Sequence, residues 1–576
     1  MSAYFRAIAI DFDGTLTAVG PPSDTVLQSI DRVRAQGLSV ILVTGRIAAE
    51  LRAVFPGVDR YFDAIVAENG AVVWINGSVH SLSRPVEREL GEALDRRAVP
   101  YRRGDVLLAT HTGYEDSILD EIQRLGLECQ LVHNRGELMI LPAGISKGSG
   151  LARALETLGI SFHSTIAVGD AENDHSLLGG CEFGVAVANA VEGLKRHADL
   201  VLEQPDGDGV TALLECIARG DDAALAPGRW RVEIGRFADG QPVTIAASRL
   251  NVLITGRSKS GKSFVAGAIA ERLMELGYSV CLIDPEGDYT SLGDLHGVEC
   301  LGNAGHAPDI GQIRRFLAHR FGSVIVDLSL VDSTKQAACT QELLGALAID
   351  RKSSGLPHWI IVDEAHHALG LPGVLGEILG EGQKGYCLVT YQPQELEAHL
   401  AAAMDYFLVL PGGRRLAGAD PVAELERITG TVLAPQLEDL HTGQALLIAS
   451  GKQREVQPIE LAPRRTAHVR HWHKYVQGKL PPRLRFCFRG QHGSGAVTAA
   501  NVQEFCDLVR ESPADVIVFH AERFDFSRWI GQALQEGGLA GSVRSLEQRF
   551  TASPHAADDI AALRQEVTGV IMQHYG

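Results

Sequence analysis

The sequence predicts an α/β protein made of two successive series of strands and helices, followed by a mostly helical segment. In residues 1–220, short β-rich runs alternate with helical stretches, and a second alternating series occupies residues 229–463. Such alternation is typical of a parallel sheet with helices on both faces. Residues 464–576 begin with a mixed stretch and become mostly helical. The length of 576 residues suggests roughly three or four domains, and we expect these three.

The individual strands follow from apolar runs bounded by turn residues. In the first series the expected strands are FRAIAI, SVILVT, AIVAE and TIAVGD. In the second they are NVLITG, SVCLID, SVIVDL, HWIIVDE and YCLVTY, after a small β-rich stretch, RWRVEIGRFADGQPVTI. A polar, turn-like segment at residues 220–228 separates the two series. The expected helices of the last part include AANVQEFCDLVRE and DFSRWIGQALQEG.

The composition excludes some classes of function. The net charge of −18 argues against a general nucleic-acid coat, because the chain as a whole repels phosphates. A local basic channel, or one formed by an oligomer, is compatible with this charge. The nine cysteines are widely spaced and include no CxxC pair, which indicates free thiols in a reducing cytosol and a cytoplasmic location. No apolar run is long enough to cross a membrane.

The first motif is AIAIDFDGTL, an apolar strand that runs into two carboxylates. Asp11 and Asp13 stand at positions i and i+2, so they point the same way from an extended chain. Hydrolysis of a phosphate monoester is very slow without a catalyst, and a covalent intermediate divides it into two easier steps. We expect Asp11 to attack phosphorus. We expect Asp13 to protonate the leaving alcohol and then to deprotonate the water that opens the aspartyl phosphate.

Other residues complete this first site. In TIAVGDAENDHSLL, Asp170 follows a strand and offers a second carboxylate to Mg²⁺, while Asn173 and Asp174 orient it or anchor a lysine. Thr44 ends the strand SVILVT and can hold a phosphate oxygen with its hydroxyl and the neighbouring N–H. Lys147, at a helix start, supplies the remaining positive charge. The expected metal ligands are Asp11, Asp13, Asp170 and Asp174.

This set resembles the haloacid-dehalogenase superfamily of phosphatases. DFDGT, TGR, the isolated lysine and GDxxND are similar to its four motifs, in the same order. AENGA, at Ala67–Ala71, resembles the subfamily with a large α/β cap, which includes sugar-phosphate and phosphoglycolate phosphatases. The resemblance implies a Rossmann-like core with an inserted cap, at about residues 80–145, that selects the substrate. The alternatives are acids that only solubilise strand ends, or a fold of this class that has lost activity. The four ordered motifs favour an active site.

The second motif is GxxxxGKS, placed after a strand and before an amphipathic helix. In a P-loop of this kind, Lys262 reaches the β- and γ-phosphates of ATP and Ser263 binds Mg²⁺. In HWIIVDEAHH, we expect Asp363 near Mg²⁺ and Glu364 as the base that polarises water. Gln392 ends the next strand and can sense the γ-phosphate or position water. The expected nucleotide-binding loop comprises Gly256, Arg257, Ser258, Lys259, Ser260, Gly261, Lys262 and Ser263.

The segments LIDPEGDY, DEAHH and TYQPQEL look like the HerA/FtsK class of motor ATPases, and the β-rich stretch before the P-loop resembles the small barrel that precedes it in HerA. The resemblance implies a RecA-like domain, a homo-oligomer (a hexamer) with ATP sites between subunits, and DNA as a partner. Arg414 and Arg415 in PGGRRLAG are candidates for an arginine finger or, alternatively, a solvated basic turn. His366 and His367 are expected only to pack or to position their strand.

The start of the last part carries a dense histidine cluster. His468, His471 and His473, with Trp472, could bind metal if they alternate on a strand. A packed or solvated cluster is favoured, because no matching cysteine or carboxylate pattern lies beside them. The basic run at residues 464–479 could meet nucleic acid or an acidic neighbour. We predict no role for the helical end.

Three hypotheses follow from the combination of motifs. The first is a Mg²⁺-dependent phosphatase, acting on a small phosphoester or a nucleic-acid end, fused to an ATP-hydrolysing domain that feeds, gates or regulates it. The second is a nucleic-acid motor in repair or defence with an accessory end-processing phosphatase. The third is an assembly protein in which ATP switches oligomerisation while the phosphatase acts on a metabolite. The sequence does not identify the substrate, because cap loops select it by shape.

Overall fold

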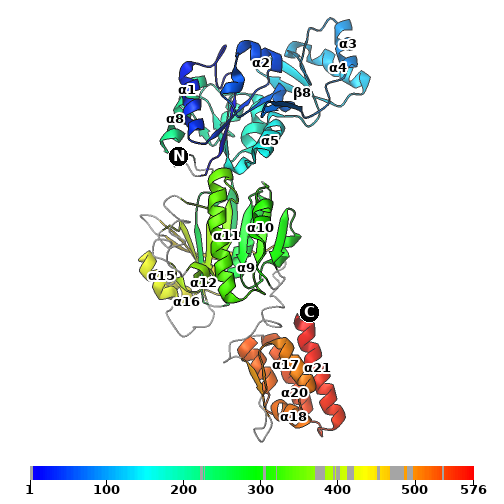
Figure 1. The fold of residues 1–576 in the computed structure, drawn as a ribbon, viewed down its shortest axis with the longest axis vertical. Helices are drawn as coiled ribbons and strands as arrows, with labels where there is room; N and C mark the ends of the chain where they lie inside the picture. The colour runs from blue at the N-terminus through cyan, green and yellow to red at the C-terminus, as the bar shows by residue number, and fades with distance from the viewer. Residues whose placement is uncertain are drawn as a thin grey trace. The chain divides into compact units, whose positions relative to one another are not determined.

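The computed structural model describes most of the chain, in two compact units. The first unit comprises Met1–Leu282, Ile310–Val324 and Thr340–Pro463, and the second comprises Ile283–Asp309, Ile325–Cys339 and Arg464–Gly576 (Figure 1). The description leaves out residues 1–3, 221–224, 226–227, 258, 303–305, 320, 370–382, 394–395, 397–402, 412–420, 451–454, 467–484, 490–496, 535–536 and 576. Ser258, Arg414, Arg415 and the cluster of His468, His471, Trp472 and His473 therefore lie outside the described residues.

The first sheet has eight strands in the order β12-β11-β10-β1-β2-β3-β4-β5. Its six parallel strands are β1 (Ala7–Asp11), β2 (Ser39–Val43), β3 (Ala64–Ala67), β10 (Thr165–Gly169), β11 (Phe183–Ala186) and β12 (Leu200–Val201). The antiparallel strands β4 (Val72–Ile75) and β5 (Ser78–Ser81) close one edge. The expected strands of the first series are all present. Because β1 is buried along its whole length, its apolar residues form the centre of this core.

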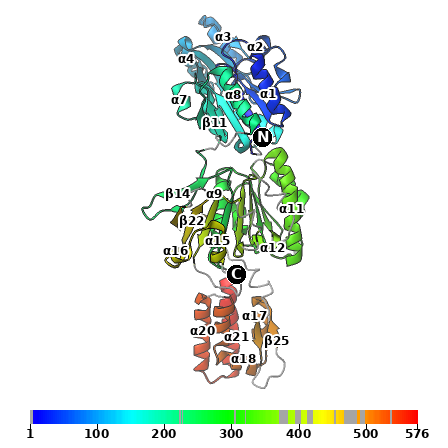
Figure 2. The same ribbon diagram turned by 90° about the vertical axis from the view of Figure 1, so that its left-hand side faces the viewer.

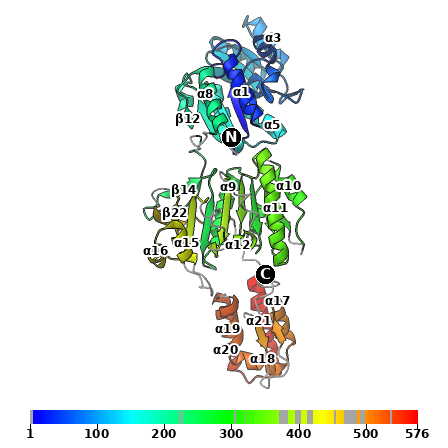
Figure 3. The same ribbon diagram turned by 60° about the vertical axis from the view of Figure 1, so that its left-hand side comes forward.

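In the part of the chain that the structure describes, six α-helices accompany this sheet. Helices α1 and α8 lie beside each other (Figure 3), and α5 begins at Lys147 with Ser146 as its N-cap, whose hydroxyl accepts from the Ser149 N–H. This cap fixes where the helix starts and therefore where the lysine lies. The helices are α1 (Asp24–Ala35), α2 (Ala48–Val54), α5 (Lys147–Leu158), α6 (His175–Gly180), α7 (Glu192–Lys195) and α8 (Asp206–Arg219).

A separate α/β cap is inserted between β5 and α5, as the sequence predicted. Its four-stranded sheet runs in the order β6-β7-β9-β8, with all neighbours antiparallel. The cap has its own apolar core, in which Leu90 and Ile118 of its two helices belong to one cluster with Leu138 and Ile140 of β9. The elements are β6 (Arg102–Arg103), β7 (Leu108–His111), β8 (Cys129–Asn134), β9 (Glu137–Pro142), α3 (Arg88–Arg96) and α4 (Glu115–Leu125).

The second sheet is mixed. Within the first unit, eight of its strands are ordered β14-β13-β23-β22-β21-β15-β20-β19. Strands β21, β15, β20 and β19 are parallel neighbours, whereas the other pairs are antiparallel. The β-rich stretch before the P-loop forms the β13–β14 hairpin, and its pairing with β23 makes it an extension of this sheet (Figure 2). The bounds are β13 (Arg231–Arg236), β14 (Pro242–Ala246), β15 (Val252–Gly256), β19 (Trp359–Val362), β20 (Tyr386–Thr390), β21 (Tyr406–Leu410), β22 (Gln444–Ala449) and β23 (Val456–Leu461).

The remaining elements of this part of the chain include the other two predicted strands, SVCLID and SVIVDL, as β16 and β18. The remaining elements are β16 (Val280–Asp284), β17 (Val298–Gly302), β18 (Ser323–Asp327), α9 (Lys262–Glu275), α10 (Ile310–Leu317), α11 (Ser333–Ser354), α12 (Ala365–Leu369), α15 (Pro421–Thr429) and α16 (Ala434–Glu438). Among the described helices, none combines the length and the apolar character that a membrane crossing requires.

Among its described residues, the C-terminal part is mostly helical and includes the small β24–β25 hairpin, which confirms the predicted fold class. Helices α20 and α21 run alongside each other (Figure 2). Its core combines aliphatic side chains with a group of aromatic ones, in which the rings of Phe505 and Trp529 stack with centroids 4.4 Å apart. The elements are β24 (Phe486–Phe488), β25 (Val497–Ala499), α17 (Val502–Glu511), α18 (Ala514–Ala521), α19 (Asp525–Trp529), α20 (Gly537–Thr551) and α21 (Ala557–Tyr575).

Candidate active sites

The first candidate site lies where three neighbouring parallel strands end. Strand β1 lies between β10 and β2, with Asp11 opposite Val43 and Ile10 opposite Val168. Because parallel strands end at the same edge of a sheet, the residues that follow them gather there. The structure thus brings together Asp11, Thr44 and Asp170, although Asp170 lies more than a hundred residues after the other two in the sequence.

A buried cluster of charges forms the centre of this site. Oxygen atoms of Asp11, Asp170 and Asp174 lie within 4.8 Å of one another, and all three residues are buried. Lys147 Nζ donates to Asp11 Oδ1 at 2.5 Å and to Asp174 Oδ1 at 2.6 Å. Burial and the neighbouring Asp174 raise the pKa of Asp11 well above its usual value. Burial alone would lower the pKa of Lys147, but the two carboxylates that it contacts raise it.

This cluster fits a divalent cation. The cluster contains three buried carboxylates and one lysine, so it has an excess of negative charge when all of these groups are ionised. All the donor atoms are carboxylate oxygens, which are the ligands that Mg²⁺ prefers. Asp170 also accepts from Thr15 Oγ1 at 3.0 Å, and Asp174 Oδ2 accepts from the Asp170 and Ala171 N–H groups. The carboxylates are therefore held in fixed orientations by their own neighbours.

Asp13 lies apart from the three-carboxylate group, although the sequence analysis placed it among the metal ligands. Arg46 holds its carboxylate by two bonds, Nη2 to Oδ1 at 2.6 Å and Nε to Oδ2 at 2.8 Å. The Asp13 side chain is 39% exposed, so it can reach a molecule from the solvent side. Thr44 is fully buried, and its hydroxyl oxygen accepts from the Arg46 N–H. Sequence reasoning missed Arg46, although it completes the TGR motif.

The AENGA segment connects the core to the cap. The carboxylate of Glu68, which is fully buried, accepts from the backbone N–H groups of Asp105, Val106 and Leu107 in the cap. Asn69 accepts from the Asn173 side-chain amide at 3.0 Å. Gly70 has φ +103°, and a Cβ there would lie 1.9 Å from the Ser146 carbonyl oxygen, so only glycine fits. These contacts set the cap and the start of α5 against the catalytic edge.

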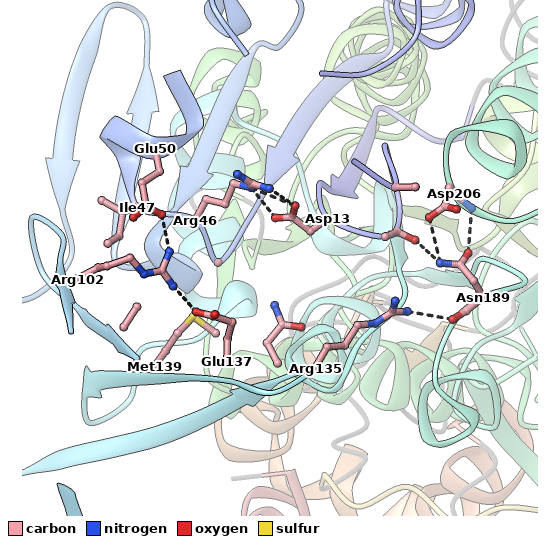
Figure 4. A pocket seen from close by; sticks show the side chains of 15 residues that line it. Asp13, Arg46, Ile47, Glu50, Arg102, Arg135, Glu137, Met139, Asn189 and Asp206 are labelled. Atoms are coloured by element: carbon pink, nitrogen blue, oxygen red, sulfur yellow. Dashed lines mark hydrogen bonds and ion pairs between the residues drawn. The ribbon is translucent and has the colours of Figure 1, made fainter. Parts of the chain in front are cut away.

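A cavity of about 620 Å³ opens between the core and the cap beside this cluster (Figure 4). Arg102 of β6 pairs with Glu50 of α2 at 3.0 Å and also with Glu137 of β9. Arg135, at the tip of the β8–β9 hairpin, donates to the Asn189 carbonyl at 3.0 Å and pairs with Asp170. The walls include apolar side chains as well. The lining residues are Asp13, Gly14, Ala18, Gly45, Arg46, Ile47, Glu50, Arg102, Ala109, Asn134, Arg135, Glu137, Met139, Asn189 and Asp206.

The second candidate site follows β15 in the mixed sheet. Gly256 has φ +152°, and a Cβ there would lie 2.8 Å from the Leu410 carbonyl oxygen, so the loop requires glycine at this position. Gly261 precedes α9 with φ +96°, and Lys262 begins the helix. Lys262 is buried, and its Nζ donates to the Arg257 carbonyl at 3.1 Å. The lysine thus folds back over its own loop, as the spacing GxxxxGKS requires.

The predicted partners of the P-loop lie at the same edge of the sheet. Strand β20 is the parallel neighbour of both β15 and β19, so the residues after all three strands gather there. Asp363 is buried and accepts from the Glu364 N–H at 2.8 Å, while Glu364 has φ +46°. Thr390 Oγ1 accepts from the Gln392 N–H at 2.9 Å. Of the predicted nucleotide-binding residues, only Ser258 lies outside the described part of the chain.

Through its N-terminal part, the chain belongs to the haloacid dehalogenase-like hydrolases, whose family model matches residues 8–94 and 106–214. A phosphoglycolate phosphatase of Archaeoglobus fulgidus is 34% identical over 229 residues, which are 36% of this chain and 96% of that protein. Phosphoglycolate phosphatase 2 of Saccharolobus solfataricus is 31% identical and covers 37% of this chain and 93% of its own length. A solved haloacid dehalogenase-like hydrolase from Bacteroides thetaiotaomicron, 22% identical, covers 37% of this chain and 99% of its own, with a TM-score of 0.33.

The second part of the chain matches another family. The model of the central domain of the helicase HerA matches residues 232–304, which include the β13–β14 hairpin and the P-loop. The chain therefore joins a haloacid-dehalogenase phosphatase domain with a buried aspartate cluster to a HerA central-domain region.

Proposed function

We propose that the N-terminal domain hydrolyses phosphate monoesters through an aspartyl phosphate on Asp11. The observation that carries this proposal is the buried cluster of Asp11, Asp170, Asp174 and Lys147 beside a cavity of about 620 Å³ that Asp13 and Arg46 line. Asp11, Asp170 and Asp174 would hold Mg²⁺, which when bound neutralises charge on the phosphoryl oxygens. Lys147 keeps the Asp11 carboxylate oriented and offsets the repulsion between an anionic nucleophile and an anionic substrate.

Two proton transfers complete the proposed cycle. An Asp11 oxygen forms the new bond to phosphorus while the bond from phosphorus to the substrate oxygen breaks, and Asp13 gives that oxygen a proton. Asp13 then takes a proton from water, and this water attacks phosphorus. Phosphate leaves and the Asp11 carboxylate is restored. Arg46 holds the Asp13 carboxylate with two hydrogen bonds, which orients it for both transfers.

For the substrate, we propose a small phosphorylated carboxylic acid of the phosphoglycolate type. The relatives named above support this choice, as does the presence of Arg102 and Arg135, which the cap brings into the cavity. Guanidinium groups bind carboxylates with two parallel hydrogen bonds. The competing candidate is a phosphorylated nucleic-acid end, which the HerA match favours.

We further propose that the second part binds and hydrolyses ATP, with Lys262 and Ser263 on the phosphates and Mg²⁺, Asp363 near the metal, and Glu364 polarising water. The loop geometry at Gly256 and the placement of these residues at one sheet edge support this proposal. By analogy with HerA, the chain would act as a homo-oligomer, with DNA as the candidate partner. The ATPase would feed or regulate the phosphatase.

A phosphoester panel that includes phosphoglycolate, sugar phosphates and 3′- and 5′-phosphorylated DNA, run with and without ATP, tests these proposals. We expect Asp11→Asn to abolish turnover and Lys262→Ala to abolish ATP hydrolysis, while the control Asp208→Asn changes neither. Turnover that persists in a clean Asp11→Asn preparation would refute the nucleophile. Turnover of the DNA ends alone would replace the proposed substrate, and ATP hydrolysis that DNA fails to stimulate at any salt concentration would exclude a DNA motor.

A further inference from the structure

A buried histidine stands between the two polar residues expected to handle water in the ATPase site. His366, in helix α12, is 3% exposed. Its Nδ1 lies 3.1 Å from Thr390 Oγ1, at the end of β20, and 3.5 Å from Glu364 Oε2. Thr390 Oγ1 also accepts from the Gln392 N–H at 2.9 Å. The imidazole therefore lies between Glu364, which follows β19, and Thr390, the last residue of β20.

The hydrogen-bond pattern determines which ring nitrogen carries the proton. A carboxylate can only accept, so a lone pair on Nδ1 facing Glu364 would be repelled. We assign the proton to Nδ1, which donates it to Thr390 Oγ1. That oxygen then uses one lone pair for His366 and the other for Gln392. Burial, His367 and Lys262 lower the pKa of His366 to about 3, so the ring stays neutral and keeps this single proton.

The surroundings of the ring include the P-loop lysine. The ring of Tyr391 lies 4.5 Å from the ring of His366, and Lys262 Nζ lies 5.7 Å from the centroid of Tyr391. His366 Nε2 is buried and makes no hydrogen bond to any residue that the structure describes. A ring that served only for packing would be better replaced by an apolar one, because a buried polar atom without a partner costs stability. The imidazole is therefore retained for its contact at Nδ1.

We propose that His366 is a positioning residue for ATP hydrolysis, which holds the Thr390 hydroxyl and, through it, the backbone N–H of Gln392 beside the Glu364 carboxylate. The inference rests on the proposed ATPase function. Glu364 follows β19 and Gln392 follows β20, so the position of the Gln392 backbone relative to Glu364 depends on the contact that His366 of α12 makes with the end of β20. Without this contact, the end of β20 and Gln392 would spend less time in the arrangement beside Glu364 that positions the attacking water.

The test measures ATP hydrolysis by the full chain, with kcat and KM determined separately. We expect His366→Ala to lower kcat by about 10- to 100-fold and to leave the KM for ATP within about twofold. His366→Asn places an amide N–H where Nδ1–H stood and should restore kcat to within a few-fold of the wild type. His367→Ala is the matched control, because this neighbouring ring is exposed and only 4.1 Å away.

Thr390→Val, which removes the bridging oxygen with little change of volume, should lower kcat in the same way. The double variant His366→Ala with Thr390→Val should be no slower than His366→Ala alone, because both break one bridge. Unchanged kcat in His366→Ala, failure of His366→Asn to restore it, or additive losses would overturn the proposal. If His366→Ala does not fold, Thr390→Val alone decides. A wild-type chain that hydrolyses no ATP would instead refute the proposed ATPase function.

Discussion

Lys147 lies in a position that only a cation can hold. It is 1% exposed and contacts one oxygen each of Asp11 and Asp174. Removing a buried charge from a cluster of opposite charges leaves the partners without compensation. The same lysine therefore stabilises the fold and serves the proposed chemistry, and these two roles can be separated by comparing variants.

We predict that Lys147→Met lowers the free energy of unfolding by about 3–5 kcal/mol, since it leaves buried carboxylates without a cation. Asp11→Asn should cost far less, because Lys147 keeps Asp174 as a partner and one of the repelling carboxylates is gone. Chemical denaturation of the two variants measures the difference, with Lys195→Met, at a partly exposed lysine paired with Glu192, as the control. Equal costs for both variants would contradict the idea that the lysine neutralises the cluster.

At the scale of elements, the cap hairpin formed by β8 and β9 brings a charged tip to the core. Arg135 has φ +44° and Gly136 has φ +92°, the left-handed conformations that a tight hairpin turn requires. The tip carries Arg135 to Asn189 and Asp170 on the core side of the cavity. A hairpin that is joined to a separate cap sheet can move with that cap, so its contacts depend on how the cap is placed.

We predict that Arg135→Ala raises the KM of the phosphatase reaction by about 10- to 100-fold, with a smaller change in kcat. The reason is that the side chain reaches the cavity beside the proposed metal ligands without belonging to the nucleophile or to the acid. Steady-state kinetics on the best substrate of the panel provide the measurement. Arg153→Ala, which removes an exposed arginine on α5, is the control. An unchanged KM would place the substrate away from the hairpin tip.

Helix α20 carries a buried carboxylate that links it to α19. Glu547 is fully buried and accepts from the Phe526 and Ser527 N–H groups. Burial raises the pKa of Glu547 from 4.5 to about 7. The folded pKa exceeds the unfolded one, so folding takes up a proton. The resulting stability is fully present below pH 4.5 and is lost as the pH rises through 7.

Glu547→Gln should therefore remove this pH dependence and stabilise the C-terminal helices at pH 8 by up to about 3 kcal/mol relative to the wild type. Hydrogen exchange of the α19 and α20 amides in the full chain, corrected for the intrinsic effect of pH, measures it. Burial also lowers the pKa of the nearby His520. The folded state is therefore destabilised by His520 as the pH falls, which opposes the stabilisation by Glu547. The difference between variant and wild type isolates Glu547, and a constant difference from pH 5 to 8 would refute the assignment.

Strands and motifs were predictable from the sequence because their patterns are local. The run before Asp11 and the run before Gly256 each combine β-branched residues with a following turn, and both form buried strands. The roles of Glu68 and Arg46 could not be predicted in the same way. Glu68 binds three backbone groups of the cap, and Arg46 binds a carboxylate thirty-three residues earlier in the chain. Such pairs depend on how the elements pack, which periodicity does not encode.

At the scale of the molecule, a buried polar network joins the two α/β parts within the first compact unit. Glu182, which precedes β11, is fully buried and accepts from Tyr278 Oη at 2.8 Å and from Ser248 Oγ at 2.5 Å. His163 Nδ1 also lies 2.8 Å from the Glu182 carboxylate. His163 also stacks on the ring of Tyr278 and donates from Nε2 to the Leu276 carbonyl, just after α9.

We predict that Glu182→Ala costs about 3–5 kcal/mol, because it leaves several buried groups without their common acceptor. It should also divide one unfolding transition of the phosphatase and P-loop parts into two. Calorimetry of the full chain measures both effects, and Glu192→Ala, which removes an exposed ion pair with Lys195, is the control. A single transition of unchanged midpoint would mean that the network contributes little.

The network also bears on how the enzyme can be divided for study. A fragment that stops at Gly220 would keep His163 and Glu182 but lose their partners Ser248, Leu276 and Tyr278. The surface around His163 and Glu182, which is buried in the whole chain, would then be exposed to water. Such an excised phosphatase should be less soluble and less heat-resistant than the same domain in the whole chain. A shortened protein prepared for crystallisation would do better to extend through Pro463, where the first compact unit ends, or to carry polar replacements on the newly exposed face.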